Sequence, residues 1–327
     1  MIKILLLVMD ARKANIDALY QSIVDISDCK VVYLNSQEQD DLEGSLSQYD
    51  FSSYDYVLAI LRSKKMMQQH RFFARMKNLV FVEYDAWLNF YPNKYKGKFS
   101  NLYRKTNPEL IVSSGYGVSE KLKKEGFEVE FVPKGYDHAL LKNLNLPRDI
   151  KYGFIGSVKN QFYAKRVEFI SKAEKAFGLI SFQTESGNDY LQGLNRIDFF
   201  ISADIGFGEY MIKNFEAMAC GCVLFAFDQG AEENAALGFK DMENVVLYST
   251  VDDLSQKIRA LEDNPQLAES IRRSGQQLAE EGFRYDLIAK KIIELLEIRK
   301  ANGYRMTSEP SRGLFKKLIA GLLGSGH

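Results

Sequence analysis

The sequence is poor in the residues that build disulfide frameworks and metal centres. It has three cysteines and three histidines in 327 residues. An odd and sparse set of cysteines is typical of a protein kept in a reducing compartment. Cys220 and Cys222 are too close together for a C-x-x-C pair, and the chain contains no D-x-D triplet. We therefore expect neither a zinc site nor any other metal cofactor.

The sequence also lacks a charge imbalance and long apolar runs. Lys and Arg total 43, as do Asp and Glu, so the net charge is zero and argues against a general nucleic-acid-binding protein. No segment approaches the roughly 20 apolar residues of a membrane span. The apolar start, M-I-K-I-L-L-L-V-M, ends at Asp10 and is too short for a good signal peptide. We expect a cytoplasmic protein whose first run is a buried strand.

Short apolar runs alternate with amphipathic segments, which predicts βαβ units and mostly parallel sheets. The polar segment 143–149, which contains Pro147, is the predicted hinge between two doubly wound, Rossmann-like domains. The predicted parts are residues 1–145, residues 146–285, a helix at 286–304 that returns to the first domain, and a tail at 305–327. We expect strands at residues 4–9, 30–34, 56–61, 78–83, 110–113, 129–132, 152–155, 179–182, 198–203 and 223–227, and helices at 14–26, 64–76, 118–125, 165–177, 190–195, 251–261, 265–281 and 285–300.

The stretch K-N-F-E-A-M-A-C-G-C, residues 213–222, precedes the apolar run V-L-F-A-F and then D-Q-G. A helix beginning just before Glu216 would direct its N–H groups and positive dipole end at a ligand, an arrangement that favours phosphate. Lys213 adds a cation there, and Glu216 can accept hydrogen bonds from two hydroxyls, such as those of a ribose. A plain packed helix with a surface Lys and Glu explains these ten residues equally well.

Further phrases occur in a characteristic order: F-V-P-K-G-Y-D at 131–137, Y-G-F-I-G-S-V-K at 152–159, F-E-A-M-A-C-G at 215–221 and M-E-N-V-V-L-Y at 242–248. As a set they resemble the large retaining group of GT-B glycosyltransferases, with a group 1 or family 4-like donor domain, nearest to its CgeB-like branch. The resemblance covers about residues 131–296. It implies two Rossmann-like domains facing each other across a cleft, with an acceptor in the first and a nucleotide sugar in the second.

The resemblance also implies roles for particular residues. Glu216 corresponds to the ribose ligand and Lys213, followed by Asn214 and Phe215, to the diphosphate contact. Gly156, Ser157 and Lys159 would form a second phosphate-facing loop. Many relatives carry two Glu residues separated by seven others, whereas here Glu209 stands one place late. The usual Gly-rich loop after the first strand is also replaced by D-A-R-K-A-N at 10–15. The resemblance therefore does not identify the residues that bind the donor sugar or those that bind the acceptor.

The catalytic group should follow a strand of the first domain. In F-V-E-Y-D-A-W, residues 81–87, Asp85 ends an apolar strand and is the candidate base, with Glu83 as its rival. A simple helix or turn cap is the alternative for Asp85. The aromatic residues that follow could stack on an acceptor sugar, pack in the core or form a lid; they are Trp87, Phe90, Tyr91 and Tyr95.

Two features suggest an anionic membrane surface as a partner. Eleven basic and two acidic residues lie between Arg62 and Lys105. On a helix, the tail would separate an apolar side from a basic one, as interfacial helices do, although docking on a partner chain, such as another glycosyltransferase, is the alternative. The apolar side has Leu314, Phe315, Leu318, Ile319, Leu322 and Leu323, and the basic side has Lys316 and Lys317.

These observations together predict a metal-independent glycosyltransferase, and the resemblance implies that it is a retaining one, although the residues themselves do not identify the anomeric outcome. We expect it to use a nucleotide diphosphate sugar, with UDP the commonest choice, and a lipid-linked or membrane-anchored glycan acceptor. Lipopolysaccharide or capsule synthesis at the cytoplasmic face of a bacterial inner membrane would fit. The alternatives are a non-catalytic nucleotide-sugar-binding subunit and a nucleotide-sugar epimerase or hydrolase of the same fold.

Overall fold

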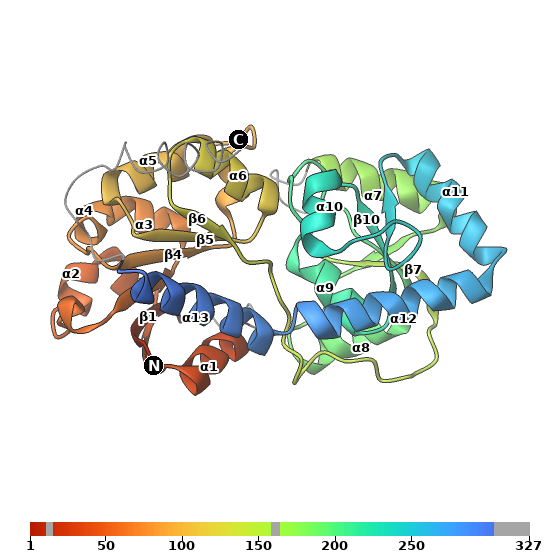
Figure 1. Cartoon of the computed structure of the whole chain (residues 1–327). Helices are drawn as coiled ribbons and strands as arrows, with labels where there is room; N and C mark the ends of the chain where they lie inside the picture. The colour runs from red at the N-terminus through yellow and green to blue at the C-terminus, as the bar shows by residue number, and fades with distance from the viewer. Residues whose placement is uncertain (11–15, 158–163, 304–327) are drawn as a thin grey trace, which may run out of the picture.

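The computed structural model describes residues 1–10, 16–157 and 164–303, and it consists of two helix-flanked parallel sheets (Figure 1). The first has the strand order β2-β1-β3-β4-β5-β6 and the second β11-β10-β9-β7-β8. The predicted α/β fold class with two doubly wound domains is confirmed. The strands are β1 (Lys3–Met9), β2 (Asp28–Leu34), β3 (Tyr56–Ile60), β4 (Leu79–Glu83), β5 (Leu110–Ser113), β6 (Val129–Phe131), β7 (Ile150–Ile155), β8 (Ile180–Phe182), β9 (Ile197–Ile201), β10 (Val223–Phe227) and β11 (Val246–Tyr248).

Each sheet reverses its strand order at one place. In the first sheet β1 lies between β2 and β3, and in the second β7 lies between β8 and β9. Ligands of open α/β sheets bind outside the carboxyl ends of the strands at such a reversal. In the second sheet this point is followed by Gly156 and Ser157 after β7 and by Ser202 and Asp204 after β9.

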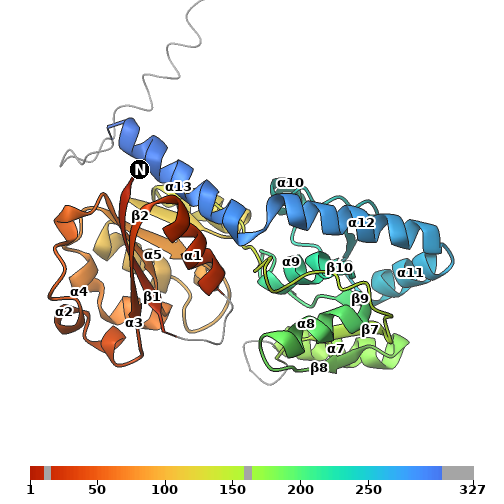
Figure 2. The same ribbon diagram turned by 90° about the horizontal axis from the view of Figure 1, so that it is seen from below.

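Helices from both ends of the chain cover the first sheet. The β1 residues Ile4 and Leu6 pack with α1 and with Ile288 and Ile292 of α13, while Leu5 of β1 faces the opposite cluster with Phe99. Helix α13 thus lies beside α1 although the two are far apart in sequence (Figures 1 and 2). The helices of this domain are α1 (Asp17–Ile26), α2 (Leu42–Ser45), α3 (Ser63–Gln68), α4 (His70–Phe73), α5 (Lys98–Thr106), α6 (Tyr116–Lys124) and α13 (Tyr285–Ala301).

The second sheet has its own core. On one side α9 packs against α12 and β10, and α7 packs against α11 elsewhere in the domain. Asn264 caps α12 by accepting a hydrogen bond from the Leu267 N–H, and Pro265 occupies the first turn, where a missing N–H costs nothing. The helices are α7 (Ala164–Phe177), α8 (Asn188–Arg196), α9 (Ile212–Ala219), α10 (Ala231–Leu237), α11 (Val251–Glu262) and α12 (Pro265–Gly282).

The two chain crossings between the domains are hydrogen-bonded to each other. The Tyr136 N–H donates to the Phe283 carbonyl at 2.9 Å, and the Tyr285 N–H donates to the Tyr136 carbonyl at 3.0 Å. A side chain on Gly135 would clash with the Phe283 carbonyl, so glycine permits this close approach.

The first crossing lies earlier than the predicted hinge at 143–149. Val132 is buried in the first domain, whereas Tyr136 and Leu141 already belong to the core of the second. Asn143 and Arg148 also bind groups of the second domain, namely Gln276 and the Cys220 carbonyl. The polar composition of the predicted hinge therefore reflects these contacts rather than a linker.

The predicted helix at 64–76 is also interrupted. Residue Gln69 leaves the helical region with φ −93° and ψ 19°, which separates α3 from α4. Its side-chain amide donates to the Asp40 carbonyl, so a tertiary contact accounts for the break. Within the described residues, no helix combines the length and apolar composition needed to cross a bilayer.

Candidate functional site

A buried carboxylate, Asp204, organises the start of α9. Its Oδ2 accepts hydrogen bonds from the Met211 N–H at 3.0 Å, the Asn214 amide at 2.7 Å and the Ser202 hydroxyl at 3.1 Å. Its Oδ1 accepts one from Arg166 at 3.1 Å. Because Met211 directly precedes α9, Asp204 occupies the place of an N-terminal cap and compensates the positive end of the helix dipole.

Glu216 and Lys213 lie close together on α9, as their spacing suggests. The buried Glu216 carboxylate accepts a hydrogen bond from the Tyr190 hydroxyl, and the Lys213 ammonium lies 4.8 Å from the centroid of the Tyr190 ring. Burial raises the pKa of Glu216, although Lys213 opposes this change, and burial lowers the pKa of Lys213. A ligand with hydroxyls for Glu216 and anionic oxygens for Lys213 would restore much of the solvation that these charges lose.

Arg166 on α7 supplies a second cation that sequence reasoning missed. Its buried guanidinium donates to the Ala203 carbonyl and to Asp204, and its charge is one cause of the lowered pKa of Lys213. Gly156 and Ser157 lie on the same carboxyl edge of the sheet, after β7. The predicted loop residue Lys159 falls outside the described residues.

The side chains of two other residues predicted to bind the donor contact other parts of the protein. The Asn214 amide donates to Asp204 and to the Met211 carbonyl. The Phe215 ring is buried, with its centroid 4.4 Å from that of Phe283. The Oδ1 of Asn214 is buried and has no partner among the described residues. Any contact between Phe215 and a donor would involve its backbone.

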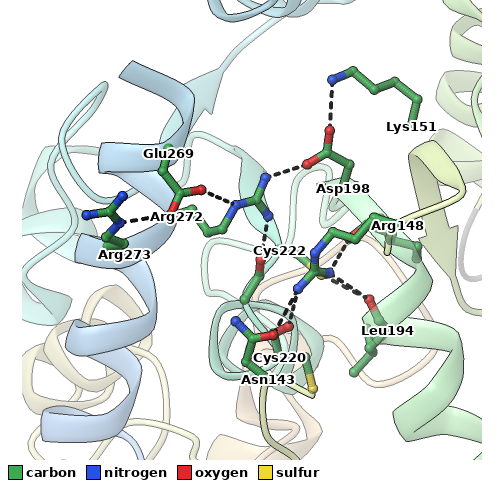
Figure 3. Close-up of polar contacts among 12 residues, drawn as sticks. Asn143, Arg148, Lys151, Leu194, Asp198, Cys220, Cys222, Glu269, Arg272 and Arg273 are labelled. Carbon is green, nitrogen blue, oxygen red and sulfur yellow. Dashed lines mark hydrogen bonds and ion pairs between the residues drawn. The ribbon is translucent and has the colours of Figure 1, made fainter. Parts of the chain in front are cut away.

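Two arginines bind the turn that joins α9 to β10 (Figure 3). Arg148 donates to the Cys220 carbonyl at 2.7 Å, and Arg272 donates to the Gly221 carbonyl. These carbonyls follow the C-terminal end of α9, where cations interact favourably with the helix dipole. Gly221 adopts φ 73°, and a side chain there would clash with Asn143. Glycine therefore fits at position 221, where a larger residue would not.

The thiols beside this turn are structural. Cys220 and Cys222 are buried and free, and burial raises the pKa of both, to about 11 for Cys222. No group of three or more His, Cys, Asp or Glu side chains in the described parts of the chain could hold a metal ion.

On the first domain, the two candidate carboxylates differ sharply. Glu83 is buried at the end of β4 near Tyr103, and its Oε1 has no hydrogen-bond partner among the described residues. Burial raises the pKa of Glu83 to about 8, with a further contribution from Asp85. The side chain of Asp85 is exposed before the turn Ala86–Asn89, although nearby protein still displaces solvent and raises its pKa against the effect of Lys134. Asp85 is thus the carboxylate that a ligand can reach.

Charged groups also connect the domains. Glu209 forms a buried ion pair with Lys134 at 2.7 Å, and the same ammonium donates to the Ser114 hydroxyl at 2.8 Å. Burial raises the pKa of Glu209 to about 7, although Lys134 opposes the change. On α10, Glu233 accepts the Gly117 N–H of α6 at 2.9 Å. The Glu that stands one place late in the motif therefore binds the other domain in this structure.

The segment that contains this site is similar to known proteins. Residues 165–294, which contain α9 and its surroundings, match a family model described as glycosyl transferase-like. No curated protein is similar enough in sequence to match the chain.

Solved structures match almost the whole chain at low identity and so define its fold. Anabaena HepE in complex with UDP has a TM-score of 0.67 and 15% identity, covering 90% of this chain and 100% of its own. Sucrose-phosphate synthase from Thermosynechococcus elongatus has a TM-score of 0.67 and 9% identity, covering 92% and 100%. S. aureus MnaA with UDP has a TM-score of 0.58 and 13% identity, covering 95% and 99%. The resemblance to GT-B glycosyltransferases is confirmed at the level of the fold: this chain has the GT-B fold, and residues 165–294 match the glycosyl transferase-like model.

Replacing Gly221 tests the turn after α9. Gly221→Ala should lower the free energy of unfolding by more than the roughly 1–2 kcal/mol expected for a left-handed residue alone, because the new methyl group also meets Asn143. Gly178→Ala is the matched control, since it has φ 75° with open space around it. Urea denaturation of both variants measures the difference. Equal losses would show that the turn is not crowded.

Glu83 should make stability depend on pH. Its folded pKa of about 8 lies above the unfolded value, so its favourable contribution is present in acid and is lost as the pH rises through 8. Glu83→Gln keeps a neutral side chain and should reduce the fall in unfolding free energy between pH 5 and pH 8, by roughly 4 kcal/mol at most. Glu168→Gln, at an exposed carboxylate whose pKa is lowered by Lys172, is the control. An unchanged pH dependence in Glu83→Gln would contradict this assignment.

Proposed function

We propose that this protein is a glycosyltransferase that moves a sugar from a UDP-sugar to a glycan acceptor. The principal support is the arrangement of Lys213, Glu216 and Tyr190 on the carboxyl side of the second sheet, within the segment that matches the glycosyl transferase-like model. The similar structures of HepE with UDP-glucose and of MnaA with UDP support UDP as the nucleotide.

On this proposal, α9 binds the donor through complementary charges. Glu216 accepts hydrogen bonds from the ribose hydroxyls, and Lys213 and Arg166 stabilise the negative charge that develops on the leaving diphosphate. Asp204 keeps Arg166 and the start of α9 in position through its hydrogen bonds. The chain's own cations then stabilise the leaving group, and transfer should continue in the presence of EDTA.

Asp85 has the proposed role on the acceptor side. An ionised carboxylate within hydrogen-bond reach of an acceptor hydroxyl can accept its proton as the hydroxyl attacks. Glu83 is a poorer base at neutral pH because burial favours its protonated form. The resemblance to retaining enzymes leads us to propose that the anomeric configuration of the sugar is kept, which requires the hydroxyl to attack from the same face as the departing diphosphate.

A non-catalytic nucleotide-sugar-binding subunit is the second candidate. It is favoured by Glu209, which binds Lys134 instead of facing the donor side. An epimerase or hydrolase of the same fold is a third. An assay with radiolabelled UDP-sugar and lipid-extracted acceptor separates them: transfer supports the first function, binding without turnover supports the second, and an epimer or free sugar supports the third.

The Glu216→Ala variant tests the donor site. Loss of hydrogen bonds to a charged acceptor, each worth about 1.5–3 kcal/mol, should weaken UDP binding by at least tenfold without unfolding the protein. Isothermal titration calorimetry with UDP measures the affinity. Glu262→Ala is the control, because this exposed carboxylate pairs with Tyr152 away from α9. Unaltered UDP affinity in Glu216→Ala would exclude Glu216 as the ribose ligand.

The Asp85→Asn variant tests the proposed base. It should retain UDP affinity and reduce the rate of sugar transfer by about 100-fold or more, the range expected when a general base is lost. Glu83→Gln, at the neighbouring buried carboxyl, should affect transfer much less. Full activity in Asp85→Asn would assign the proton transfer to another group.

We also propose that the acceptor is lipid-linked and that the protein binds an anionic membrane surface. Helices α3, α4 and α5, which pack together in the first domain, carry most of the basic residues between Arg62 and Lys105 (Figure 1). Among the described residues, acidic partners neutralise at least three of these bases: Lys65 pairs with Asp40, Arg75 with Glu43 and Arg104 with Glu125. The surplus of positive charge favours anionic lipid. The tail, from Leu314 to Leu323, lies outside the described residues, so its proposed part rests on its sequence pattern.

Vesicle flotation tests this membrane proposal. Changing the exposed bases Lys64, Arg71 and Lys98 to Glu should weaken binding to phosphatidylglycerol vesicles by at least about 100-fold, since each base contributes about 1 kcal/mol near an anionic surface. Deleting residues 311–327 should also release the protein from the vesicles. Added salt should weaken the binding of the full chain to the vesicles without abolishing it. The exposed bases Lys172, Lys240 and Lys290 are control positions for the same change. Equal flotation of all variants would overturn the proposal, and the tail would then be better interpreted as a docking helix for a partner protein.

A further inference from the structure

Phe207 belongs to the second domain but packs in the core of the first. Its ring is 5% exposed and stacks on Trp87, with the centroids 4.3 Å apart and the planes at 28°. The Tyr91 ring meets it edge-on at 6.2 Å, and the Arg166 guanidinium lies 5.3 Å from its centroid. Phe207 therefore contacts a cation of the proposed donor site and an indole two residues after Asp85.

The indole that Phe207 covers has an unused hydrogen-bond donor. The Nε1–H of Trp87 is buried and has no partner among the described residues. Buried indole N–H groups usually find a partner, because an unpaired one loses its hydrogen bond to water. The apolar Phe207 ring cannot accept a strong hydrogen bond, whereas a sugar hydroxyl can. A pyranose on this surface would stack its C–H face on the indole, and a hydroxyl that extends beyond the edge of the indole would accept a hydrogen bond from the Nε1–H.

The backbone that carries Phe207 can pivot. Gly206 and Gly208 flank it with φ of 80° and 72°, a region that other residues rarely adopt. Gln229, two residues after the end of β10, holds this loop, because its amide oxygen accepts the Gly208 N–H at 2.9 Å and its amide nitrogen donates to the Asp204 carbonyl at 2.7 Å. A rotation at the two glycines can therefore move the ring while the loop stays anchored at Asp204.

We propose that Trp87 and Tyr91 form a subsite for a pyranose unit of the acceptor, and that Phe207 occupies this subsite until the acceptor displaces its ring. The inference rests on the proposed glycosyltransferase function and assigns the acceptor-binding residues of that site. Displacement removes the apolar ring that touches both Arg166 and Trp87. The acceptor hydroxyl beside Asp85 then faces the donor without Phe207 between them.

The fluorescence of Trp87 gives a direct test, since it is the single tryptophan of the chain. In Phe207→Ala, acrylamide should quench this fluorescence several-fold more strongly than in the wild type. Methyl β-D-glucopyranoside or methyl β-D-galactopyranoside should protect Trp87 in the variant at concentrations at least tenfold lower than in the wild type. Mannitol, an acyclic polyol, should protect neither protein.

Two further variants serve as a control and as a replacement in this fluorescence test. Phe177→Ala removes a ring that packs on Tyr152 in the second domain and should leave the quenching of Trp87 unchanged. Phe207→Leu keeps an apolar side chain, and it replaces Phe207→Ala in every measurement if the alanine variant does not fold.

The inference is overturned if Trp87 is equally accessible in the wild type and the Phe207 variant, or if neither pyranoside protects it in the variant. A UDP titration by thermal shift runs alongside, because ligands that bind the native state raise its melting temperature. Stabilisation by UDP without pyranoside protection would reject the subsite and retain the proposed function. Protection by a pyranoside without stabilisation by UDP would retain the subsite and reject UDP-sugar transfer.

Discussion

The buried carboxylate of Asp204 is the interaction on which the rest of the site depends. It binds the N–H before α9, the Asn214 amide and the Arg166 guanidinium, so one side chain connects the loop after β9 to two helices. Lys213 and Glu216 lie on α9, which begins beside this carboxylate. Phe207 and Glu209 lie on the loop that joins β9 to α9. A carboxylate with four hydrogen-bond donors in a buried setting is well satisfied, and removing it would leave those donors without their partner.

The ion pair between Glu209 and Lys134 has a different role, because its members come from opposite sides of the domain boundary. A buried pair adds little net stability compared with apolar residues, but loss of one partner leaves an isolated charge and typically costs 3–5 kcal/mol. Such a pair therefore favours one arrangement of the domains over others. The hydrogen bond that Glu233 of α10 accepts from the Gly117 N–H of α6 has the same effect. Together they hold the two domains in one relative arrangement.

The sequence predicted those parts of the protein that have local signals. The alternation of apolar runs predicted both parallel sheets, and the spacing of Lys213 and Glu216 placed both side chains beside each other. Tyr190 and Arg166 were missed because each sits in an ordinary amphipathic helix, and only the fold brings them to α9. Helix α5 was missed for two reasons. Its buried side includes the polar residue Ser100. The side chain that caps its first N–H groups, Asn89, lies ten residues before Phe99 in the sequence. Contacts of this kind cannot be inferred from periodicity.

The packing of α13 against α1 bears on how the chain folds during synthesis. The face of β1 that carries Ile4 and Leu6 is covered in part by Ile288 and Ile292, which are made almost 300 residues later. Until the ribosome has released that segment, the first sheet has an uncovered apolar face, although all of its strands are complete by Phe131. The first domain to emerge is therefore the last to be finished, and the second domain can fold entirely within that interval.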